Sequence, residues 1–415
     1  NSQTMSGLTI GKSTNEKNIT INSALSVAGP ISIYGGAIDV NADITATGGD
    51  ILLDADIGSG VNSNKDGINI ADNITIQTVT SGNINMIGRS TSGAITDKSG
   101  FRAAANTEVN AAGSLSITGT CESSSEYTSR GINLIGTFSA VGDVTILGND
   151  NVAVTKDGVV FNGASISSTS GSISIHGVGE SSIYGYGTNT ISATNNINLY
   201  SNKIYFSTVS VDFNADGLVN ILAEDGSTSF KSGLTLGSGI TFDSGITGLT
   251  VGNTGNTANI TLNATTSIAG PISIYGGDIT VSGNITSTLS EADVLLKASE
   301  DILLDTSKTI TTNGGDVILW VDSDTIGAGS ITLNASAGIF TEGGDIVLGG
   351  GSDPLIGFAT ANTIHGVELK SSTSLNSTGG NISIRGQSNL DFNGVSSGIY
   401  SENSTINSTT GAISM

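Results

Sequence analysis

The sequence predicts an all-β protein, a single-chain right-handed parallel β-helix (β-solenoid) with three short strands in each coil of about 30 residues. Three observations predict this fold. A glycine followed by alternating apolar and polar residues recurs along the chain, these glycines are spaced by about one coil, and a much longer segment is duplicated. A parallel β-helix explains all three, because each coil buries its apolar face only by stacking on the next coil.

The short pattern is typical of a half-buried strand, in which apolar side chains point inward and small polar ones point outward. It begins with glycine, which permits the backbone turn that starts the strand. Its clearest copies are Gly82–Met86, Gly113–Ile117, Gly142–Ile146, Gly171–Ile175, Gly315–Leu319, Gly344–Leu348, Gly380–Ile384 and Gly411–Met415. We expect Asn85, Ser116, Thr145, Ser174, Ser383 and Ser414 to face outward.

The spacing of the glycines indicates the architecture. Gly113, Gly142 and Gly171 are 29 residues apart, and two weaker strand patterns fall inside each interval. A sandwich or barrel of short antiparallel strands needs a hairpin turn at nearly every junction, and Asp-Gly pairs are too few for that. We therefore expect the three glycines to lie in one column, with Ile, Val and Leu filling the interior.

The longer duplication divides the chain into two repeats. Ala28–Gly36 and Ala269–Gly277 have the same sequence, AGPISIYGG, at an offset of 241 residues. This predicts a first long repeat unit over residues 1–246 and a second, incomplete one over 247–415 that continues the same solenoid. Because the chain opens without Met and ends inside a strand pattern, we interpret it as a segment of a longer mature protein.

Composition excludes several classes of protein. The chain has 14 basic and 36 acidic residues and a formal net charge of −22, whereas nucleic-acid binding requires a basic surface and anionic lipid repels an acidic one. No run of 18 apolar residues is present, so we expect no direct membrane insertion by a helix. A single cysteine, Cys121, allows no intramolecular disulfide.

Repeated Gly-Asp-Ile-x-Leu strands in an acidic chain rich in Ser, Thr and Asn resemble the haemagglutinin-type bacterial adhesins. The long repeat, poor in Cys and Pro, is also similar to the giant repetitive surface adhesins of gliding Bacteroidetes, which links the chain to gliding motility. The resemblance covers nearly the whole chain. It implies a long right-handed β-helix exported to the bacterial cell surface, and it carries no catalytic residues.

The candidate catalytic residues are few. His176 and His365 follow apolar strand residues, in a slot that holds Ile87, Thr118, Leu147 or Arg385 in other coils, so we expect that slot to be outward and undemanding. No His and Cys spacing suits zinc, and no nucleophile elbow is present. The chain is therefore predicted not to be an enzyme and to hold no cofactor.

Acidic residues leave two alternatives open. Asp follows the strand-starting glycine at Asp50, Asp143, Asp278, Asp316 and Asp345, but other coils place Asn, Ser or Ala there, which favours turn chemistry. Stacked Asp residues could still hold Ca²⁺ between coils. They could also supply the paired carboxylates of a polysaccharide lyase or hydrolase, with Asp316 and Asp322 as the residues to test.

A few strands have apolar residues on both faces, which places Leu295, Ile318 and Val347 on the outside. Ile318 and Val347 are 29 residues apart and should be stacked neighbours beside Trp320, the only tryptophan. Ile318, Trp320 and Val347 therefore form a candidate contact strip. The alternatives are that an inserted loop or the neighbouring long repeat covers the strip, or that an outside partner binds it.

The sequence as a whole predicts a non-enzymatic extracellular segment of a large bacterial surface adhesin, acting as a rod or stalk and as an attachment surface. The expected partners are glycans, surfaces or other cell-surface proteins, and a single-chain solenoid should be monomeric within a longer chain. The alternative functions are a polysaccharide-degrading β-helix enzyme and a segment of a phage-tail fibre, which would form trimers.

Overall fold

The computed structural model describes residues 5–55, 65–91, 98–122, 130–150, 157–179, 181–206, 210–224, 226–361, 364–388 and 396–415. These residues form strands and turns and contain no helix. The chain divides into two compact units, Asn1–Gly217 and Leu218–Met415, and each is described by itself. The predicted repeats over 1–246 and 247–415 are defined by sequence similarity, not by compactness, and their boundary stays a prediction.

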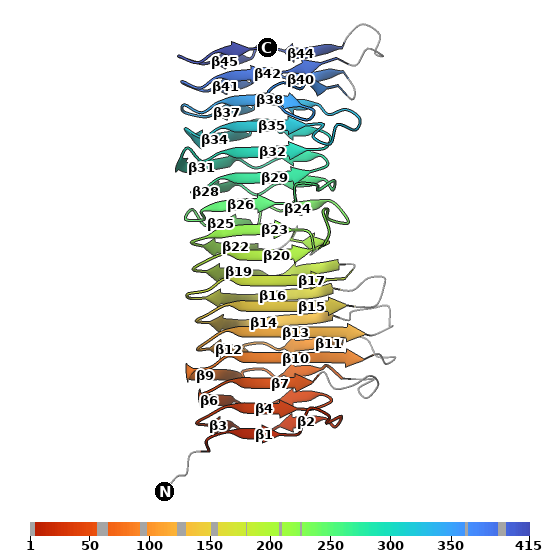
Figure 1. The fold of residues 1–415 in the computed structure, drawn as a ribbon, viewed down its shortest axis with the longest axis vertical. Coiled ribbons are helices and arrows are strands. Elements are labelled where there is room, and N and C mark those ends of the chain that lie inside the picture. The colour runs from red at the N-terminus through yellow and green to blue at the C-terminus, as the bar shows by residue number, and fades with distance from the viewer. Residues whose placement is uncertain are drawn as a thin grey trace. The chain divides into compact units, whose positions relative to one another are not determined.

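Each coil of the first unit has three faces, and strands of successive coils lie side by side on each face (Figure 1). The first face consists of β1 (Leu8–Ile10), β4 (Ile31–Tyr34), β7 (Ile51–Ala55), β10 (Ile84–Thr91), β13 (Leu115–Glu122), β15 (Val144–Asp150), β17 (Ile173–Val178) and β20 (Ile197–Ser201). The second face contains β2 (Ile19–Ile21), β5 (Ile38–Val40), β8 (Ile68–Ile70), β11 (Ser99–Ala103), β18 (Ser181–Tyr186) and β21 (Ile204–Tyr205). The third contains β3 (Leu25–Val27), β6 (Ile44–Gly48), β9 (Thr75–Ser81), β12 (Glu108–Ala111), β19 (Thr188–Ala193) and β22 (Ser210–Ala215). Two longer strands, β14 (Arg130–Ala140) and β16 (Asp157–Ser168), run from the second face onto the third.

The second unit repeats this plan. Its first face consists of β23 (Leu218–Leu222), β26 (Gly248–Val251), β29 (Ile272–Gly276), β32 (Val294–Ala298), β35 (Val317–Val321), β38 (Ile346–Gly350), β42 (Ile382–Ile384) and β46 (Ile413–Ser414). The second face consists of β24 (Leu234–Leu236), β27 (Ile260–Leu262), β30 (Ile279–Val281), β33 (Ile302–Leu304), β36 (Ile331–Leu333), β40 (His365–Leu369) and β44 (Ser397–Ser401). The third consists of β28 (Thr266–Ile268), β31 (Ile285–Ser290), β34 (Thr309–Asn313), β37 (Gly338–Phe340), β41 (Ser374–Asn376) and β45 (Thr405–Asn407). The remaining strands are β25 (Ile240–Phe242) and the short pair β39 (Ala359–Thr360) and β43 (Gly386–Gln387).

Strand pairing on these faces is parallel throughout the described residues, and the one antiparallel contact among them is an isolated bridge between Gly329 and Thr360. The predicted all-β class, parallel β-helix and three strands in a coil are therefore confirmed. The right-handed sense of winding, expected from the general bias of parallel crossovers, stays a prediction.

The length of a coil is less uniform than the predicted value of about 30 residues. In-register residues on the first face are 20 apart from Ile31 to Ile51, 29 apart from Leu115 to Val144, and 36 apart from Ile346 to Ile382. The strands keep their pairing while the corners between them lengthen or shorten. This is tolerated because the entropy of closing a loop rises only slowly with its length.

The interior is a stack of aliphatic side chains in register. Ile31, Ile51 and Ile84 lie in one row of the first unit, and each is completely buried. Ile272, Val294 and Val317 form the equivalent row of the second unit and are equally buried. Each such side chain contributes about 1.5–3 kcal/mol by leaving water, so the aliphatic stack is the main source of stability.

The duplicated sequence also repeats its local structure. The Asn15 side-chain amide donates to the Tyr34 carbonyl oxygen at 2.8 Å, and Asn256 donates to Tyr275 at the same distance. The second pair lies 241 residues after the first, which is the offset of the AGPISIYGG duplication. The duplication thus preserves a side-chain contact between coils as well as a strand pattern.

The strand-starting glycines lie in columns, as predicted. The backbone N–H of Gly113 donates to the Gly82 carbonyl oxygen at 2.8 Å, and Gly142 donates to Gly113 at 2.8 Å. A Cβ atom added to Gly171 would lie 2.6 Å from the carbonyl carbon of Gly142. The predicted reason, the freedom of the glycine backbone to turn, holds for Gly82, whose φ is 117°, but not for Gly113, Gly142 and Gly171, which do not adopt positive φ. At Gly171 the backbone of the preceding coil approaches too closely for a side chain, whereas a Cβ atom on Gly142 would first meet the Ser114 hydroxyl, at 2.7 Å. Asn195 and Ala292 occupy the same column in other coils, so glycine is favoured there but not required in every coil.

Two adjacent glycines test this explanation. A Cβ atom on Gly380 would lie 2.1 Å from the Gly344 carbonyl oxygen, whereas one on Gly379 would meet nothing closer than 3.5 Å. We expect Gly380→Ala to lower the free energy of unfolding by about 1–3 kcal/mol, because the coils must separate to admit the methyl group. Gly379→Ala should stay within about 1 kcal/mol of the wild type. Urea denaturation of both variants measures the difference, and equal stability would contradict the close-approach explanation.

Candidate functional site

The predicted contact strip lies on the first face of the second unit. Leu295 of β32, Ile318 of β35 and Val347 of β38 are in register, one from each successive coil. Lys297 and Trp320 form the next outward row. The register thus places Ile318 and Val347 as stacked neighbours beside Trp320, as the sequence predicts.

The exposure of the strip is uneven. Val347 is only 4% exposed, while Ile318 and Trp320 are half-buried. The segment 351–358 lies over this end of β38, because a Cβ atom on Gly349 would lie 2.1 Å from the Pro354 carbonyl oxygen. The 351–358 segment therefore contacts β38 at Gly349, two residues beyond Val347, and both alternatives for the strip itself stay predictions. Binding of a partner by Ile318 and Trp320 stays a prediction.

Trp320 is held in place on two sides. Its indole Nε1–H donates to the Gly351 carbonyl oxygen at 2.6 Å, and the Lys297 ammonium nitrogen lies 3.8 Å from the centroid of its ring. The lysine charge is attracted to the face of the ring by a cation–π interaction. These contacts make Trp320 an anchor for the 351–358 segment, so that the tryptophan has a structural role whether or not a partner binds.

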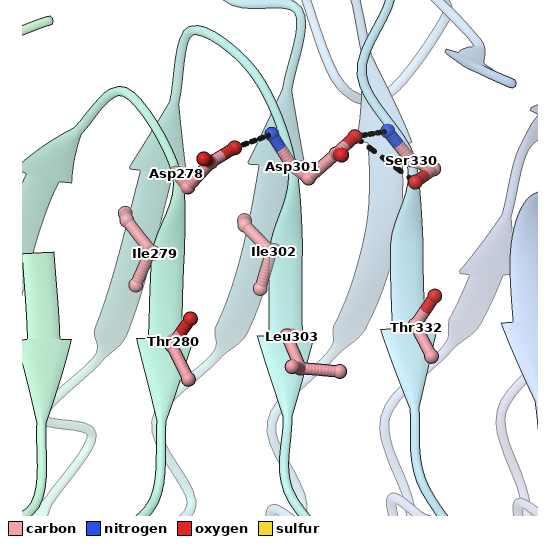
Figure 2. Close-up of a pocket in the computed structure, with 8 residues that line it drawn as sticks. All are labelled: Asp278, Ile279, Thr280, Asp301, Ile302, Leu303, Ser330 and Thr332. Atoms are coloured by element: carbon pink, nitrogen blue, oxygen red, sulfur yellow. Dashed lines mark hydrogen bonds between the residues drawn. The ribbon is translucent and has the colours of Figure 1, made fainter. Parts of the chain in front are cut away.

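A groove of about 320 Å³ opens on the second face of the same unit (Figure 2). It lies across β30, β33 and β36, with acidic and hydroxyl side chains at the start of the strands and the outward side chains of the strands further along. The lining residues are Asp278, Ile279, Thr280, Asp301, Ile302, Leu303, Ser330 and Thr332.

The carboxylates of the groove bind the neighbouring coil. Asp278 accepts a hydrogen bond from the backbone N–H of Asp301 (3.2 Å), and Asp301 accepts from both the backbone N–H (2.6 Å) and the hydroxyl (2.9 Å) of Ser330 (Figure 2). The second oxygen of Asp278 accepts from the side-chain amide of Asn259 at 2.8 Å. These carboxylates therefore already satisfy backbone and side-chain donors of adjacent coils.

The same arrangement recurs at the start of the first-face strands, in the Asp slot of the repeat. Asp293 accepts from the backbone N–H of Asp316 (2.8 Å), Asp316 from Asp345 (2.7 Å), Asp345 from Asn381 (2.6 Å) and Asn381 from Ala412 (3.0 Å). We call this set of residues the Asx ladder. The Asp slot was predicted to reflect turn chemistry. In the structure, each side-chain oxygen of the ladder accepts the backbone N–H of the residue in the same slot of the next coil.

The ladder places like charges close together. The pKa of Asp316 is raised, first by burial and then by the nearby carboxylates of Asp293 and Asp345, although the hydrogen bond from Asp345 opposes the shift. The pKa of Asp322, in the loop after β35, is also raised, by burial and by Asp324. The part of the chain that the structure describes contains no group of three or more His, Cys, Asp or Glu side chains arranged to hold a metal ion.

The two histidines occupy different slots. His176 is in register with Leu147, Thr118 and Ile87 on the first face, as the sequence predicts. His365 begins β40 on the second face, so its assignment to the same slot was wrong. Both histidines lie in an Ile-His-Gly sequence. His365, however, is the first residue of a second-face strand, in a coil that has 36 residues between Ile346 and Ile382.

Both histidines nevertheless stack on a tyrosine of the next coil. The ring centroids of His176 and Tyr200 are 4.4 Å apart, and those of His365 and Tyr400 are 4.6 Å apart with an interplanar angle of 10°. The Nδ1 atom of His365 accepts the backbone N–H of Ser397 at 3.2 Å. The histidines thus stabilise contacts between coils, which gives them a structural role.

A cluster of tyrosines on the second face of the first unit escaped the sequence analysis. The ring of Tyr184 lies 4.6 Å from that of Tyr186 and 5.5 Å from that of Tyr205, and the Lys203 ammonium lies 4.8 Å from the centroid of Tyr205. Tyr186 is 42% exposed. We call Tyr184, Tyr186 and Tyr205 the tyrosine platform.

An acid and a base adjoin this platform. Asp157 and Arg130 are in register on adjacent coils, with Nε of Arg130 4.0 Å from the Asp157 carboxylate. Burial raises the pKa of Asp157 to about 6, although the charge of Arg130 opposes the shift. The Asp157 charge contributes in turn to a raised pKa of Tyr184, whose main causes are burial and Tyr186. The platform thus combines aromatic surface with both signs of charge.

Comparisons with known proteins identify no relative of this chain. The scan against protein-family models and the searches of curated proteins and of solved structures found no match to this chain. In the described residues, no helix is long and apolar enough to cross a membrane.

The Asx ladder predicts opposite effects for two substitutions of one residue. Asp316→Asn keeps the oxygen that accepts the Asp345 N–H and removes a charge between two other carboxylates, so we expect stability at pH 7 to be unchanged or increased. Asp316→Ala removes the acceptor and should lower the free energy of unfolding by about 1–2 kcal/mol. Urea denaturation separates the two, and an alanine variant as stable as the asparagine variant would rule out the ladder as a stabilising contact.

Asp157 predicts a pH dependence of stability. Its pKa in the folded chain, about 6, exceeds the ordinary value of 3.8, so the folded protein binds more protons than the unfolded chain between these values. The free energy of unfolding should therefore fall as the pH rises from about 4 to 6, by up to about 3 kcal/mol from this residue.

Asp157→Asn should remove that part of the pH dependence. The variant is expected to melt at a higher temperature than the wild type at pH 7.5 and at a similar temperature at pH 4. Asp216→Asn, at an exposed aspartate of the same unit, is the matched control and should follow the wild-type curve. A wild-type advantage at pH 7.5 would show that the Arg130 charge outweighs burial.

Proposed function

We propose that this chain is a non-enzymatic segment of a large extracellular bacterial adhesin, which serves as a stalk and as an attachment surface for glycans. The proposal includes the kinship with surface adhesins of gliding bacteria that the sequence resembles. It rests on the parallel β-helix, whose stacked coils present long rows of outward side chains, and on the strongly acidic composition, which keeps such a chain soluble.

The observation that carries the attachment role is the tyrosine platform. Aromatic rings offer apolar faces to the C–H groups of sugar rings, and their hydroxyls donate and accept hydrogen bonds. Asp157, whose charge acts on Tyr184, and Arg130, its register partner on the preceding coil, supply an acceptor and a donor for sugar hydroxyls. The platform is built on strands, which hold its rings at fixed positions from coil to coil.

A glycan array probed with the whole chain tests the proposal. We expect saturable binding to one group of glycans, reduced at least tenfold in a Tyr184→Ala/Tyr186→Ala double variant because the stacking surface is removed. Tyr400→Ala, at a tyrosine 39% exposed in the second unit, is the matched control and should bind as the wild type does. Circular dichroism checks that each variant folds.

Two results would count against this function. Absence of saturable binding to any glycan or cell surface would leave only the stalk role, and binding that survives the double variant would place the attachment surface elsewhere on the chain.

A polysaccharide-degrading enzyme is the second candidate, and the raised pKa of Asp157 is the observation that favours it. A carboxylic acid with a pKa of about 6 is suited to act as a general acid near neutral pH. Release of reducing ends from acidic polysaccharides, lost in Asp157→Asn, Asp316→Ala or Asp322→Ala, would replace the adhesin proposal by an enzymatic one.

A further inference from the structure

Two loops of the second unit lie side by side on successive coils. The first, Asp322–Gly329, follows β35, and the second, 351–358, follows β38. At one end the N–H of Gly351 donates to the Val321 carbonyl oxygen at 3.1 Å. At the other end Gly329 and Thr360 form the isolated antiparallel bridge. Because they are joined at both ends, we call them the paired loops.

The paired loops expose large apolar side chains. Ile326 is 79% exposed, Leu355 55%, Ile356 68% and Phe358 46%. A loop whose only task is to cover the sheet would turn such residues inward, as it does with Pro354, which is buried. Four exposed aliphatic and aromatic side chains on adjoining loops are typical of a surface that a partner covers.

Hydrogen bonds hold these loops in shape, so the exposure is not a result of a loose backbone. The carboxylate of Asp353 accepts the Leu355 N–H at 2.9 Å, and its carbonyl oxygen accepts the Gly357 N–H at 2.7 Å. Asp324 accepts the Ile326 N–H at 3.0 Å in the same manner. The apolar side chains are therefore presented on fixed turns, which lowers the entropy lost when a partner binds.

The surroundings of the paired loops are strongly acidic. Six acids lie in the loops or beside the start of the neighbouring second-face strands: Asp278, Glu300, Asp301, Asp322, Asp324 and Asp353. Two basic residues adjoin the loops, Lys297 over Trp320 and Arg385 on the next coil. Glu300 lies near both Asp278 and Asp324, and its pKa is raised chiefly by the charge of Asp278. Negative charge thus extends from the groove of Figure 2 to the paired loops and exceeds the positive charge of the two basic residues beside them.

This charge selects among the classes of partner. A second copy of the chain brings a net charge of −22, and an anionic lipid surface is also negative, so both are repelled. Three of the four exposed side chains, Ile326, Leu355 and Ile356, are aliphatic and lack the flat faces on which sugar rings stack, and Phe358 alone offers one. A polypeptide segment with apolar side chains and several lysines or arginines complements this surface. Its apolar side chains can cover the loops, and its positive charges are attracted to the carboxylates at the rim.

We propose that the paired loops, with the acidic side chains of Glu300 and Asp324 at their rim, form a docking surface for a cationic amphipathic segment of a partner protein. The apolar side chains of the segment cover Ile326, Leu355, Ile356 and Phe358, while its basic side chains face the carboxylates. The surface lies in the second unit and uses none of the tyrosines of the first, so it does not depend on glycan attachment.

Fluorescence anisotropy with three labelled 14-residue peptides tests the proposal on the whole chain. The probe is an amphipathic Leu/Lys peptide, and the controls are a Lys/Ser peptide of equal charge and a Leu/Glu peptide of opposite charge. We expect micromolar, saturable binding of the Leu/Lys peptide, at least tenfold weaker binding of the Lys/Ser peptide and none of the Leu/Glu peptide. Equal affinity for the two cationic peptides would overturn the proposal, because it would show attraction by charge alone.

Variants place the binding on the loops. Leu355→Ser/Ile356→Ser and, on the neighbouring loop, Ile326→Ser should each weaken Leu/Lys binding at least fivefold. Leu289→Ser, at a leucine 57% exposed on the third face, should leave it unchanged. Glu300→Gln/Asp324→Asn should weaken binding at least threefold, and Glu342→Gln, at another exposed acid of the unit, should not.

Two further outcomes would overturn the proposal. One is absence of binding by the folded wild type, and the other is binding that the loop variants leave unchanged. Glycan binding measured on the same variants keeps the two proposals apart, since loss of the tyrosine platform should not affect the peptide and loss of the paired loops should not affect the glycans.

Discussion

Every coil of this protein must bring its backbone into hydrogen-bonding distance of the coil before it, along three faces at once. Parallel strands pair at about 4.8 Å, and that distance leaves little room for a side chain where the chain turns into the first face. Most coils place glycine there, and Asn195 and Ala292 are exceptions. The columns of Gly82, Gly113 and Gly142 in the first unit and of Gly315, Gly344 and Gly380 in the second satisfy this constraint. The aliphatic interior then supplies the free energy that holds the coils together.

The same constraint leaves a backbone N–H without a backbone acceptor at the start of each first-face strand, and the side chains of the Asx ladder accept its hydrogen bond. Asp316, Asp345 and Asn381 each use a side-chain oxygen to accept an N–H that would otherwise lack a partner in the ladder. Stacked carboxylates repel one another, and this repulsion adds to burial, the main cause of the raised pKa of Asp316. Asn or Ser at some positions of the column reduces this repulsion while keeping an acceptor in most coils.

Because the strands are fixed by pairing, variation is confined to the corners and the outward rows. The coils range from 19 to 36 residues between in-register positions, and the longest carries the 351–358 segment with its exposed leucine and isoleucine. The tyrosine platform and the row of Lys297 and Trp320 occupy outward positions of strands whose inward positions are aliphatic. Binding surfaces can thus be added to this scaffold without altering its interior.

The sequence by itself determined the fold class, the register of the glycines and the outward row containing Ile318 and Val347, because all three follow from local alternation and from spacing along the chain. It contained a further signal that was not used. Thr312, Thr341 and Ser377 each precede a column glycine by three residues, and their buried hydroxyls donate to that glycine's carbonyl oxygen.

Only the tertiary structure decided which corners fold over which faces. Three features depend on coil lengths that vary from turn to turn. They are the contact of the 351–358 segment with Gly349, the face on which His365 lies, and the contact between Tyr184 and Tyr205 of the next coil. Strand patterns repeat because backbone pairing is the same in every coil. Loop conformations do not, because each is set by contacts with coils that are distant in sequence.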